Sequence, residues 1–361
     1  MRSEEETPNK KPKVLEKNYD LIVLGNDPAG LFCAWAAAKD GCSVLVLDSH
    51  LSGAICPEWA PKKPCEEMLE VLSSRITQKN LFVQSTKSVV YHFRDGRKQK
   101  FPFLGSSYNR STLNQNLRHQ AELAGVMFLR GSYFRDLNSD ELKIDFAGET
   151  YSLHPKCIVA ADGLRSPIRS ALGTKPQDFF AVLQYQVRLK QKLDTVHFWG
   201  ESDLENGLGW FIPRGEMANI GFGVFKHVAH VLMFKLHQRL DDLMEEGWIE
   251  SDDLSQKQGG LIPLQGPVLP PGKDGIFLLG DAAGLRDPIA PGIGIGLAMG
   301  CIGGTLAGQF IAEEIRKGHT PRINGFLSTL KPLVDNRLKI QTSAEWQRME
   351  NKLSTNYPTS A

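Results

Sequence analysis

The sequence of 361 residues has no surplus of charge of either sign and no cysteine framework. Lys and Arg total 42 against 41 Asp and Glu. The resulting net charge of +1 argues against a dedicated nucleic-acid binder, because such a protein needs a basic surplus to displace phosphate counterions. The six cysteines contain no CxxC pair, which argues against a zinc framework and against the disulfide scaffold of a secreted domain. We therefore expect neither nucleic acid nor a metal ion among the ligands.

Signals for secretion, for a second nucleotide site and for hydrolytic catalysis are also missing. Residues 1–18 mix both charges and hold no apolar run, so we expect a disordered tail rather than a secretory signal, and a cytoplasmic protein. A second GxGxxG turn is absent, which argues against a dedicated NAD(P)H domain. The nine histidines are scattered, and no Ser/His/Asp set is recognisable.

The remaining composition is that of a globular protein rich in glycine. Hydrophobic residues make up 41% and charged residues 23%, as in folded domains. The length suggests two lobes. The 34 glycines make up a larger share of the chain than the average of about 7%, so their positions are informative.

The first motif is a glycine turn inside a βαβ unit of about 30 residues. An apolar run from Tyr19 leads into GNDPAG over 25–30, a small-residue helix follows, and a second apolar run ends at Asp48. Such a turn directs helix N-terminal amides at a pyrophosphate, while an acidic residue at this distance suits a ribose hydroxyl. Asp27 replaces the middle glycine, and its carboxylate would repel a pyrophosphate unless it points away. The predicted dinucleotide-binding residues are Gly25, Pro28, Ala29, Gly30 and Asp48. The alternative is an α/β domain that uses these glycines only for packing.

Two further apolar runs end in an acidic residue beside glycine. One run leads to Asp162-Gly163 and the other to Gly280-Asp281. Each would expose a carboxylate at the carboxyl end of a sheet, where open α/β sheets bind ligands. Taken singly, an Asp next to Gly after a strand is usually only a turn.

The three motifs in this order resemble the FAD-binding fold shared by aromatic hydroxylases, flavin halogenases and geranylgeranyl reductases, over about 19–312. The resemblance implies an α/β protein: a Rossmann-like FAD-binding domain of the glutathione-reductase/hydroxylase type, with an inserted antiparallel β-sheet domain for the substrate. It places Asp162 near the pyrophosphate side of the cofactor and Asp281 at the ribityl chain. The helix after Asp281 would face the flavin ring.

The resemblance also divides the chain. The implied parts are a tail over 1–18, a discontinuous FAD-binding domain over 19–85, 105–175 and 262–320, a substrate-binding domain over 86–104 and 176–261, and a C-terminal helical segment over 321–361. Local patterns predict a hairpin over 89–103 around Asp95-Gly96, and helices over 111–125 and 231–247.

A fourth segment is similar to the geranylgeranyl reductase signature. It comprises GLGWFIPR over 207–214 and GFG over 221–223, although Leu208 and Ile212 replace the two aromatic residues of the signature. Such a segment would form an apolar wall around Trp210, suited to a long hydrocarbon chain beside the flavin. An ordinary core tryptophan is the alternative.

Other site residues are implied by the resemblance alone. Cys65, in a Lys-Pro-Cys stretch, is a candidate active-site thiol, with an inert loop cysteine as the alternative. Arg110 corresponds to the arginine before the helix that runs along the cofactor, with a surface arginine as the alternative. Pro288 opens a segment that would bring the backbone of Gly292 and Gly294 to the flavin edge.

The segment 289–312 contains no charged residue, and glycine recurs every four positions from Gly296 to Gly308. A membrane span with a glycine face is one interpretation. We favour a buried helix whose glycines let it approach a cofactor or a sheet closely.

The resemblance therefore implies an FAD-dependent oxidoreductase. It would reduce carbon–carbon double bonds of an isoprenoid or geranylgeranyl-type lipid by hydride transfer from reduced FAD. The implied partners are a hydrophobic or lipid substrate, a transient NADPH or ferredoxin-type electron donor, and a membrane surface contacted peripherally. One alternative is an FAD-dependent monooxygenase of the same fold that uses NAD(P)H and O2. A second is a non-catalytic flavin-binding homologue, which Asp27 and the altered signature residues motivate.

Overall fold

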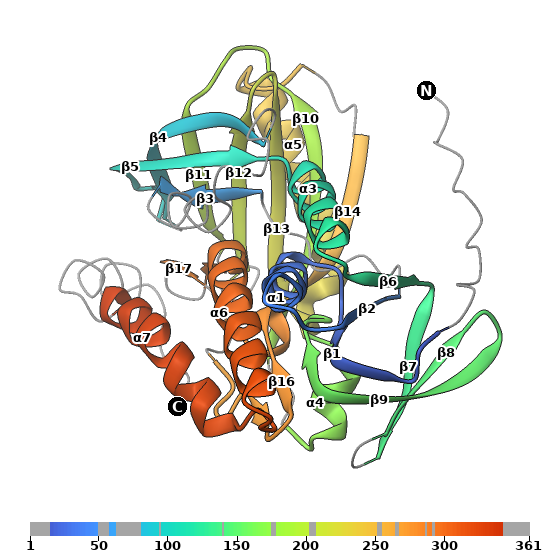
Figure 1. The fold of residues 1–361 in the computed structure, drawn as a ribbon. Helices are drawn as coiled ribbons and strands as arrows, with labels where there is room; N and C mark the ends of the chain where they lie inside the picture. Colours follow the sequence, from blue (N-terminus) through green and yellow to red (C-terminus); the bar gives the residue numbers. More distant parts are fainter. Residues whose placement is uncertain are drawn as a thin grey trace.

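The fold is built from two mixed β-sheets joined by helices, as the computed structural model in Figure 1 shows. The structure describes residues 15–49, 58–62, 81–93, 95–138, 141–174, 178–201, 207–250, 255–263, 267–285, 287–290 and 293–341. The predicted tail over 1–18 therefore lies mostly outside the described residues.

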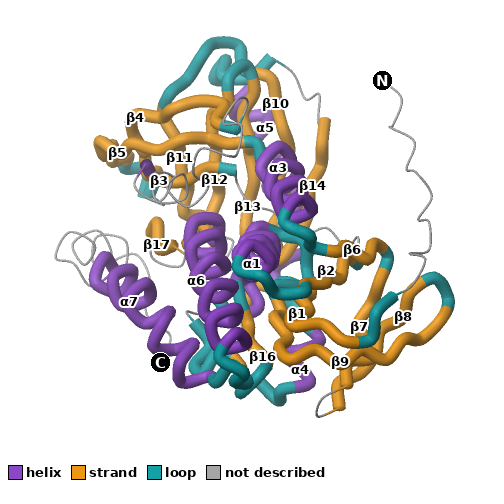
Figure 2. Tube along the Cα trace, in the orientation of Figure 1, coloured by secondary structure: helices purple, strands orange, loops and turns teal. Residues whose placement is uncertain are grey.

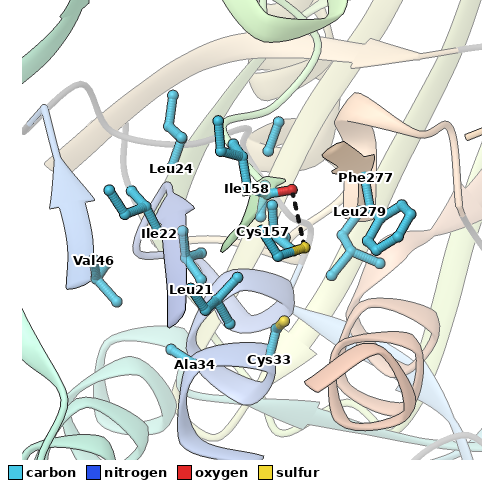
Figure 3. Packing of buried hydrophobic residues seen from close by; sticks show 14 of the residues in the cluster. Leu21, Ile22, Leu24, Cys33, Ala34, Val46, Cys157, Ile158, Phe277 and Leu279 are labelled. Carbon is cyan, nitrogen blue, oxygen red and sulfur yellow. Dashed lines mark hydrogen bonds between the residues drawn. The ribbon is translucent and has the colours of Figure 1, made fainter. Parts of the chain in front are cut away.

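The first sheet has a parallel core in the strand order β16-β9-β1-β2-β6. These strands are β1 (Asn18–Leu24), β2 (Val44–Asp48), β6 (Met127–Arg130), β9 (Glu149–Ala160) and β16 (Ile276–Leu278). Their apolar residues are buried on both faces, as in a parallel sheet covered by helices (Figure 3). Three strands extend the sheet by antiparallel pairing: β7 (Ser132–Asn138), β8 (Glu141–Phe146) and β15 (Gly272–Lys273).

Helix α1 (Pro28–Lys39) follows β1, and α6 (Gly296–Arg316) packs directly on it (Figure 2). A Cβ atom at Gly304 or Gly308 would lie less than 3.0 Å from the backbone of α1. The glycines of the 289–312 segment thus bring α6 against another helix, whereas we expected a sheet or a cofactor. No helix within the described ranges combines the length and hydropathy of a membrane span.

The second sheet has eight strands in the order β14-β10-β13-β12-β11-β4-β5-β3. They are β3 (Trp59–Pro61), β4 (Phe82–His92), β5 (Lys98–Tyr108), β10 (Phe179–Arg188), β11 (Thr195–Glu201), β12 (Gly207–Arg214), β13 (Met217–Phe225) and β14 (Ser255–Pro263). All neighbours are antiparallel except β4 and β11. The prediction of an α/β protein with a largely antiparallel inserted sheet is confirmed. Residues 59–61, which we had placed in the FAD-binding domain, pair with β5 in this second sheet.

The two faces of the second sheet pack on different helices. One face forms a core with α5 (Leu232–Glu245), which follows the 3-10 segment Lys226–Val231. The other face forms a core with residues of α1, α6 and α3 (Arg110–Leu123). The first sheet and the second sheet therefore meet at the helices that begin near the predicted cofactor site (Figure 1).

The remaining elements are α4 (Pro167–Ala171), α7 (Ile323–Gln341), the short helical turn η4 (Gly280–Ala282), and the strand pair β17 (Asp287–Ala290) and β18 (Ile293–Ile295). The predicted hairpin is present as β4–β5, and the two predicted helices are α3 and α5. Gly125 and Gly247, with φ of +93° and +76°, follow these helices and end them in the left-handed conformation.

Candidate functional site

The three sequence motifs meet at one edge of the first sheet. Parallel strands have their carboxyl ends on the same edge, and backbone hydrogen bonds continue across the residues that follow them. The amide of Ala161 donates to the carbonyl of Leu24 at 2.8 Å, and the amide of Leu279 donates to Ala160 at 2.9 Å. The amide of Gly25 donates to Leu47 at 3.0 Å. The glycine turn, the Asp162-Gly163 motif and the Gly280-Asp281 motif are thus neighbours.

The glycine turn fits tightly between β1 and β9. Gly25 has φ of +102°, and a Cβ there would lie less than 3.0 Å from the carbonyl group of Ala161. A Cβ at Gly30 would come equally close to the carbonyl oxygen of Gly25. Packing alone therefore accounts for both glycines, and the case for a ligand rests on the helix N-terminus and on the polar groups around it. Pro28 is the first residue of α1, and Ala29 lies under Gly280 and Gly300.

Asp27 is the N-cap residue of α1, but its carboxylate does not accept a hydrogen bond from the helix amides. It accepts instead from Nη2 of Arg110 at 2.7 Å. Arg110 is the first residue of α3, so this ion pair joins the starts of two helices. The carboxylate at the position of the missing glycine is therefore neutralised within the protein.

Asp48 ends β2 and is 3% exposed. Its Oδ2 lies 3.5 Å from Nη1 of Arg118 on α3, and the Arg118 guanidinium lies 4.3 Å from the ring centroid of Phe128. Arg118 was missed by the sequence reasoning, because one arginine within a helical pattern carries no signal of its partner.

Asp162 follows β9, and both of its carboxylate oxygens are buried without a hydrogen bond of standard geometry. Burial raises the pKa of Asp162 to about 6, against the opposing effects of the Ser166 hydroxyl and the Arg169 charge. Nη1 of Arg169 is likewise buried without a hydrogen-bond partner. Buried polar atoms left in this state usually mark a missing ligand or water.

Asp281 lies in η4, directly after β16. Its Oδ1 would be 3.2 Å from a Cβ on Gly296, the first residue of α6, so this carboxylate lies over the start of that helix. Pro288 and Gly294 are opposite each other in the β17–β18 pair. Cys65 and Gly292 lie outside the described residues.

The predicted apolar wall is the part of β12 that faces α1 and α6. Leu208, Trp210 and Ile212 are every second residue of the strand and therefore share this face. They pack in one core with Phe32 and Leu297. Trp210 is buried, and these contacts also suit the core-tryptophan alternative.

On both faces of the β12–β13 pair, an aromatic ring packs over a glycine of the neighbouring strand. Nε1 of Trp210 donates to Oε1 of Gln184 at 3.3 Å, and the indole covers Gly221, where a Cβ would lie less than 3.0 Å from the ring. On the opposite face, Phe222 lies in the same way over Gly209.

A largely buried charge network between α3 and the second sheet was missed by the sequence reasoning. Oε1 of Glu58 accepts from the backbone amide of Arg110 at 3.2 Å. Oε2 of Glu58 accepts from the guanidinium of Arg214 and from Nδ2 of Asn219, the latter at 3.4 Å. The Glu58 and Arg214 side chains are only 12% and 9% exposed. This network connects the start of α3 to the end of β12.

These features fit an FAD molecule. The strand ends, the N-terminus of α1 and Arg110 suit a pyrophosphate, the buried carboxylate of Asp48 suits a ribose, and the unpartnered oxygens of Asp162 suit hydroxyl or amide donors. The roles of the individual residues remain predictions.

Comparison with known proteins agrees with this fit. A family described as "FAD binding domain" matches residues 18–230, more than half of the chain. A digeranylgeranylglycerophospholipid reductase 2 of Methanopyrus kandleri is 27% identical over 318 residues, which cover 84% of this chain and 79% of that protein. The reductase 2 of the same name from Methanothermobacter thermautotrophicus is 28% identical over 331 residues, covering 86% and 81%.

Solved structures that share the fold include a reductase-like protein and a halogenase. A geranylgeranyl bacteriochlorophyll reductase-like protein from Thermoplasma acidophilum superposes with a TM-score of 0.73 at 22% identity, covering 94% of this chain and 88% of that one. The myxobacterial chondrochloren halogenase CndH superposes with a TM-score of 0.66 at 16% identity, covering 96% and 84%. The predicted resemblance to reductases and halogenases of this fold is thereby confirmed.

Proposed function

Because the chain belongs to the FAD binding domain family and is an FAD-dependent oxidoreductase, we propose that it reduces carbon–carbon double bonds of an isoprenoid lipid. The observation that carries the proposal is its similarity, over more than four-fifths of the chain, to proteins named digeranylgeranylglycerophospholipid reductase. The substrate class is thus a branched hydrocarbon chain that carries a polar head.

FAD, when bound, supplies the hydride for such a reduction. The residues of this chain hold the cofactor by charge and by backbone amides. Asp48 accepts hydrogen bonds from the ribose hydroxyl groups, and Arg110 and the N-terminus of α1 bind the pyrophosphate. Asp162 and Asp281 accept hydrogen bonds from other hydroxyl groups of the cofactor.

The apolar face of β12 excludes water from the reacting alkene. Trp210 is fixed by its hydrogen bond to Gln184, so the indole presents a rigid apolar surface toward α1 and α6. Leu208 and Ile212 extend the same surface, and their aliphatic side chains suit methyl-branched chains better than flat aromatic substrates. Cys65 is proposed as a thiol near the flavin that donates a proton or positions the substrate.

The electron donor is proposed from the resemblance to the reductases, and the membrane contact from the lipid nature of the proposed substrate. NADPH or a ferredoxin-type carrier supplies the electrons transiently. A lipid substrate resides in a bilayer, so the protein contacts the membrane surface peripherally.

The test begins with purification and flavin reconstitution. A yellow protein that loads FAD is expected, and a colourless protein that takes up no flavin would overturn the cofactor assignment. The reduced enzyme is then incubated anaerobically with a geranylgeranyl ether lipid, and the masses of the products are measured by mass spectrometry. A gain of two hydrogen atoms per saturated bond is expected.

Two outcomes would contradict the reductase proposal. One is normal flavin reduction with no hydrogen gain in the lipid. The other is oxygen consumption coupled to NAD(P)H oxidation with a hydroxylated product, which is the monooxygenase activity that the shared fold also permits.

A further inference from the structure

We propose that Asp27 holds Arg110 in the FAD-free protein in place of a phosphate, and that FAD binding transfers Arg110 from this carboxylate to the pyrophosphate. The inference rests on the proposed FAD function. It assigns to Asp27 a role in setting cofactor affinity, at a position where a glycine would let the backbone approach the phosphates.

The geometry of Asp27 supports a competing anion rather than a helix cap. Its backbone has the extended conformation usual for an N-cap residue, with φ of −78° and ψ of 165°, but its side chain makes no cap hydrogen bond. The charged atoms of the pair are 2.7 Å apart, and the Asp27 and Arg110 side chains are 26% and 21% exposed. The pair is therefore partly desolvated and is still open to an incoming ligand.

The backbone of Arg110 is fixed by contacts that do not involve Asp27. Its amide donates to Glu58, and the start of α3 is capped by Asn109, whose side chain accepts from the amide of Thr112 at 3.0 Å. Because these contacts hold the helix, the Arg110 guanidinium can exchange one anion for another without movement of α3.

The electrostatic argument gives the direction of the effect. A phosphate at the N-terminus of α1 gains the helix dipole and Arg110, but it lies near the Asp27 carboxylate and must separate Arg110 from it. A partly exposed ion pair of this kind contributes about 1 kcal/mol. Removing the Asp27 charge should therefore tighten FAD binding by roughly fivefold at low ionic strength.

The experiment is a double-mutant cycle on the full chain, with FAD itself as the probe. The dissociation constant of FAD is measured by quenching of flavin fluorescence for the wild type, Asp27→Asn, Arg110→Gln and the double variant. Asp27→Asn should bind FAD more tightly than the wild type. This advantage should shrink in high salt.

The cycle separates exchange from simple neutralisation. If Arg110 leaves Asp27 when FAD binds, Arg110→Gln weakens binding less in the wild-type background than in the Asp27→Asn background, because only the wild type loses the ion pair on binding. Equal losses in both backgrounds would show that the pair stays intact and would overturn the exchange. Unchanged or weaker binding by Asp27→Asn would also overturn it.

A matched control uses the exposed pair of Arg135 and Asp145 on the β7–β8 ladder, whose charged atoms are 3.0 Å apart. Asp145→Asn changes the net charge equally and should leave FAD affinity unaltered. Thermal unfolding of the FAD-free variants checks folding, and Arg110→Met, which keeps the aliphatic part of the side chain, takes the place of Arg110→Gln in the cycle if the latter does not fold. A wild type that binds no FAD would instead refute the proposed function.

Discussion

The Asp162→Asn substitution tests whether the fold buries an ionised carboxylate without adequate partners. Burial raises the pKa of Asp162 from its ordinary value of 3.8 to about 6. An acid whose pKa is higher in the folded chain than in the unfolded chain binds more protons when folded. The free energy of unfolding therefore falls as the pH rises from 3.8 through 6.

The structure gives the size of this effect. The difference between 3.8 and about 6 corresponds to about 3 kcal/mol of destabilisation above pH 7, and roughly half of this is present at pH 5. The Asn amide does not titrate. The free energy of unfolding of Asp162→Asn minus that of the wild type should thus be about 1.5 kcal/mol larger at pH 8 than at pH 5. Comparing two pH values cancels the constant contribution of the amide's own hydrogen bonds.

Urea unfolding of the FAD-free protein at both pH values measures the quantity directly. The matched control is Asp145→Asn, because the hydrogen bond from Thr150 and the ion pair with Arg135 lower the pKa of Asp145. Its stabilising contribution is fully present at any pH well above 3.8, so Asp145→Asn should lower the free energy of unfolding by the same amount at pH 5 and at pH 8. An Asp162→Asn variant whose difference from the wild type is the same at pH 5 and pH 8 would refute the reasoning.

Three further predictions test other parts of the fold. Gly308→Val should lower the free energy of unfolding by about 2 kcal/mol or more, because its Cβ would meet the backbone of α1. The control Gly259→Ala makes only ordinary contacts and should change this free energy by less than about 1 kcal/mol, and urea titration compares the two variants. Burial lowers the pKa of His197 from 6.5 to about 3, so the wild type should lose stability as the pH falls below 6.5; His197→Phe should flatten this pH dependence in thermal melts, and an unchanged slope would contradict it. Glu58→Gln leaves the buried Arg214 charge without its carboxylate and should cost about 3 kcal/mol in urea titration, and a change below about 1 kcal/mol would contradict the network.

The strand-and-turn motifs were predictable because their signals are local. An apolar run followed by glycine identifies a buried strand and its turn, and the rules of parallel sheets bring the ends of such strands together. Gly25, Asp162 and Asp281 consequently lie at one sheet edge, as the order of the motifs implied.

The ion pairs at the site could not be predicted, because their partners are far apart in the sequence. Arg110 and Asp27 are separated by 83 positions, and Arg214 and Glu58 by 156. A single charged side chain has no periodicity that identifies its partner. For this reason the concern about Asp27 could be stated from the sequence, whereas its neutralisation by Arg110 could be seen only in the structure.

The partner of the glycine row in α6 was misjudged for a related reason. Spacing by four residues shows that one face of the helix is smooth, but it does not say what approaches that face. Gly304 and Gly308 meet the backbone of α1, and this contact depends on the path of the whole chain between the two helices.

The glycines covered by the rings of Trp210 and Phe222 also determine the register in which β12 and β13 pair. Because side chains alternate between faces, a shift of two residues keeps every side chain on its own face and is the shift that burial alone does not prevent. In the native alignment Trp210 is opposite Gly221, and Phe222 is opposite Gly209 on the other face.

Each shift by two is tolerated on one face and opposed on the other. In one direction Trp210 would meet another glycine, Gly223, but Phe222 would then be opposite the ring of Phe211. In the other direction Phe222 would find Gly207, but Trp210 would be opposite the buried side chain of Asn219. The two faces together therefore select a single alignment of the strands that carry the apolar wall.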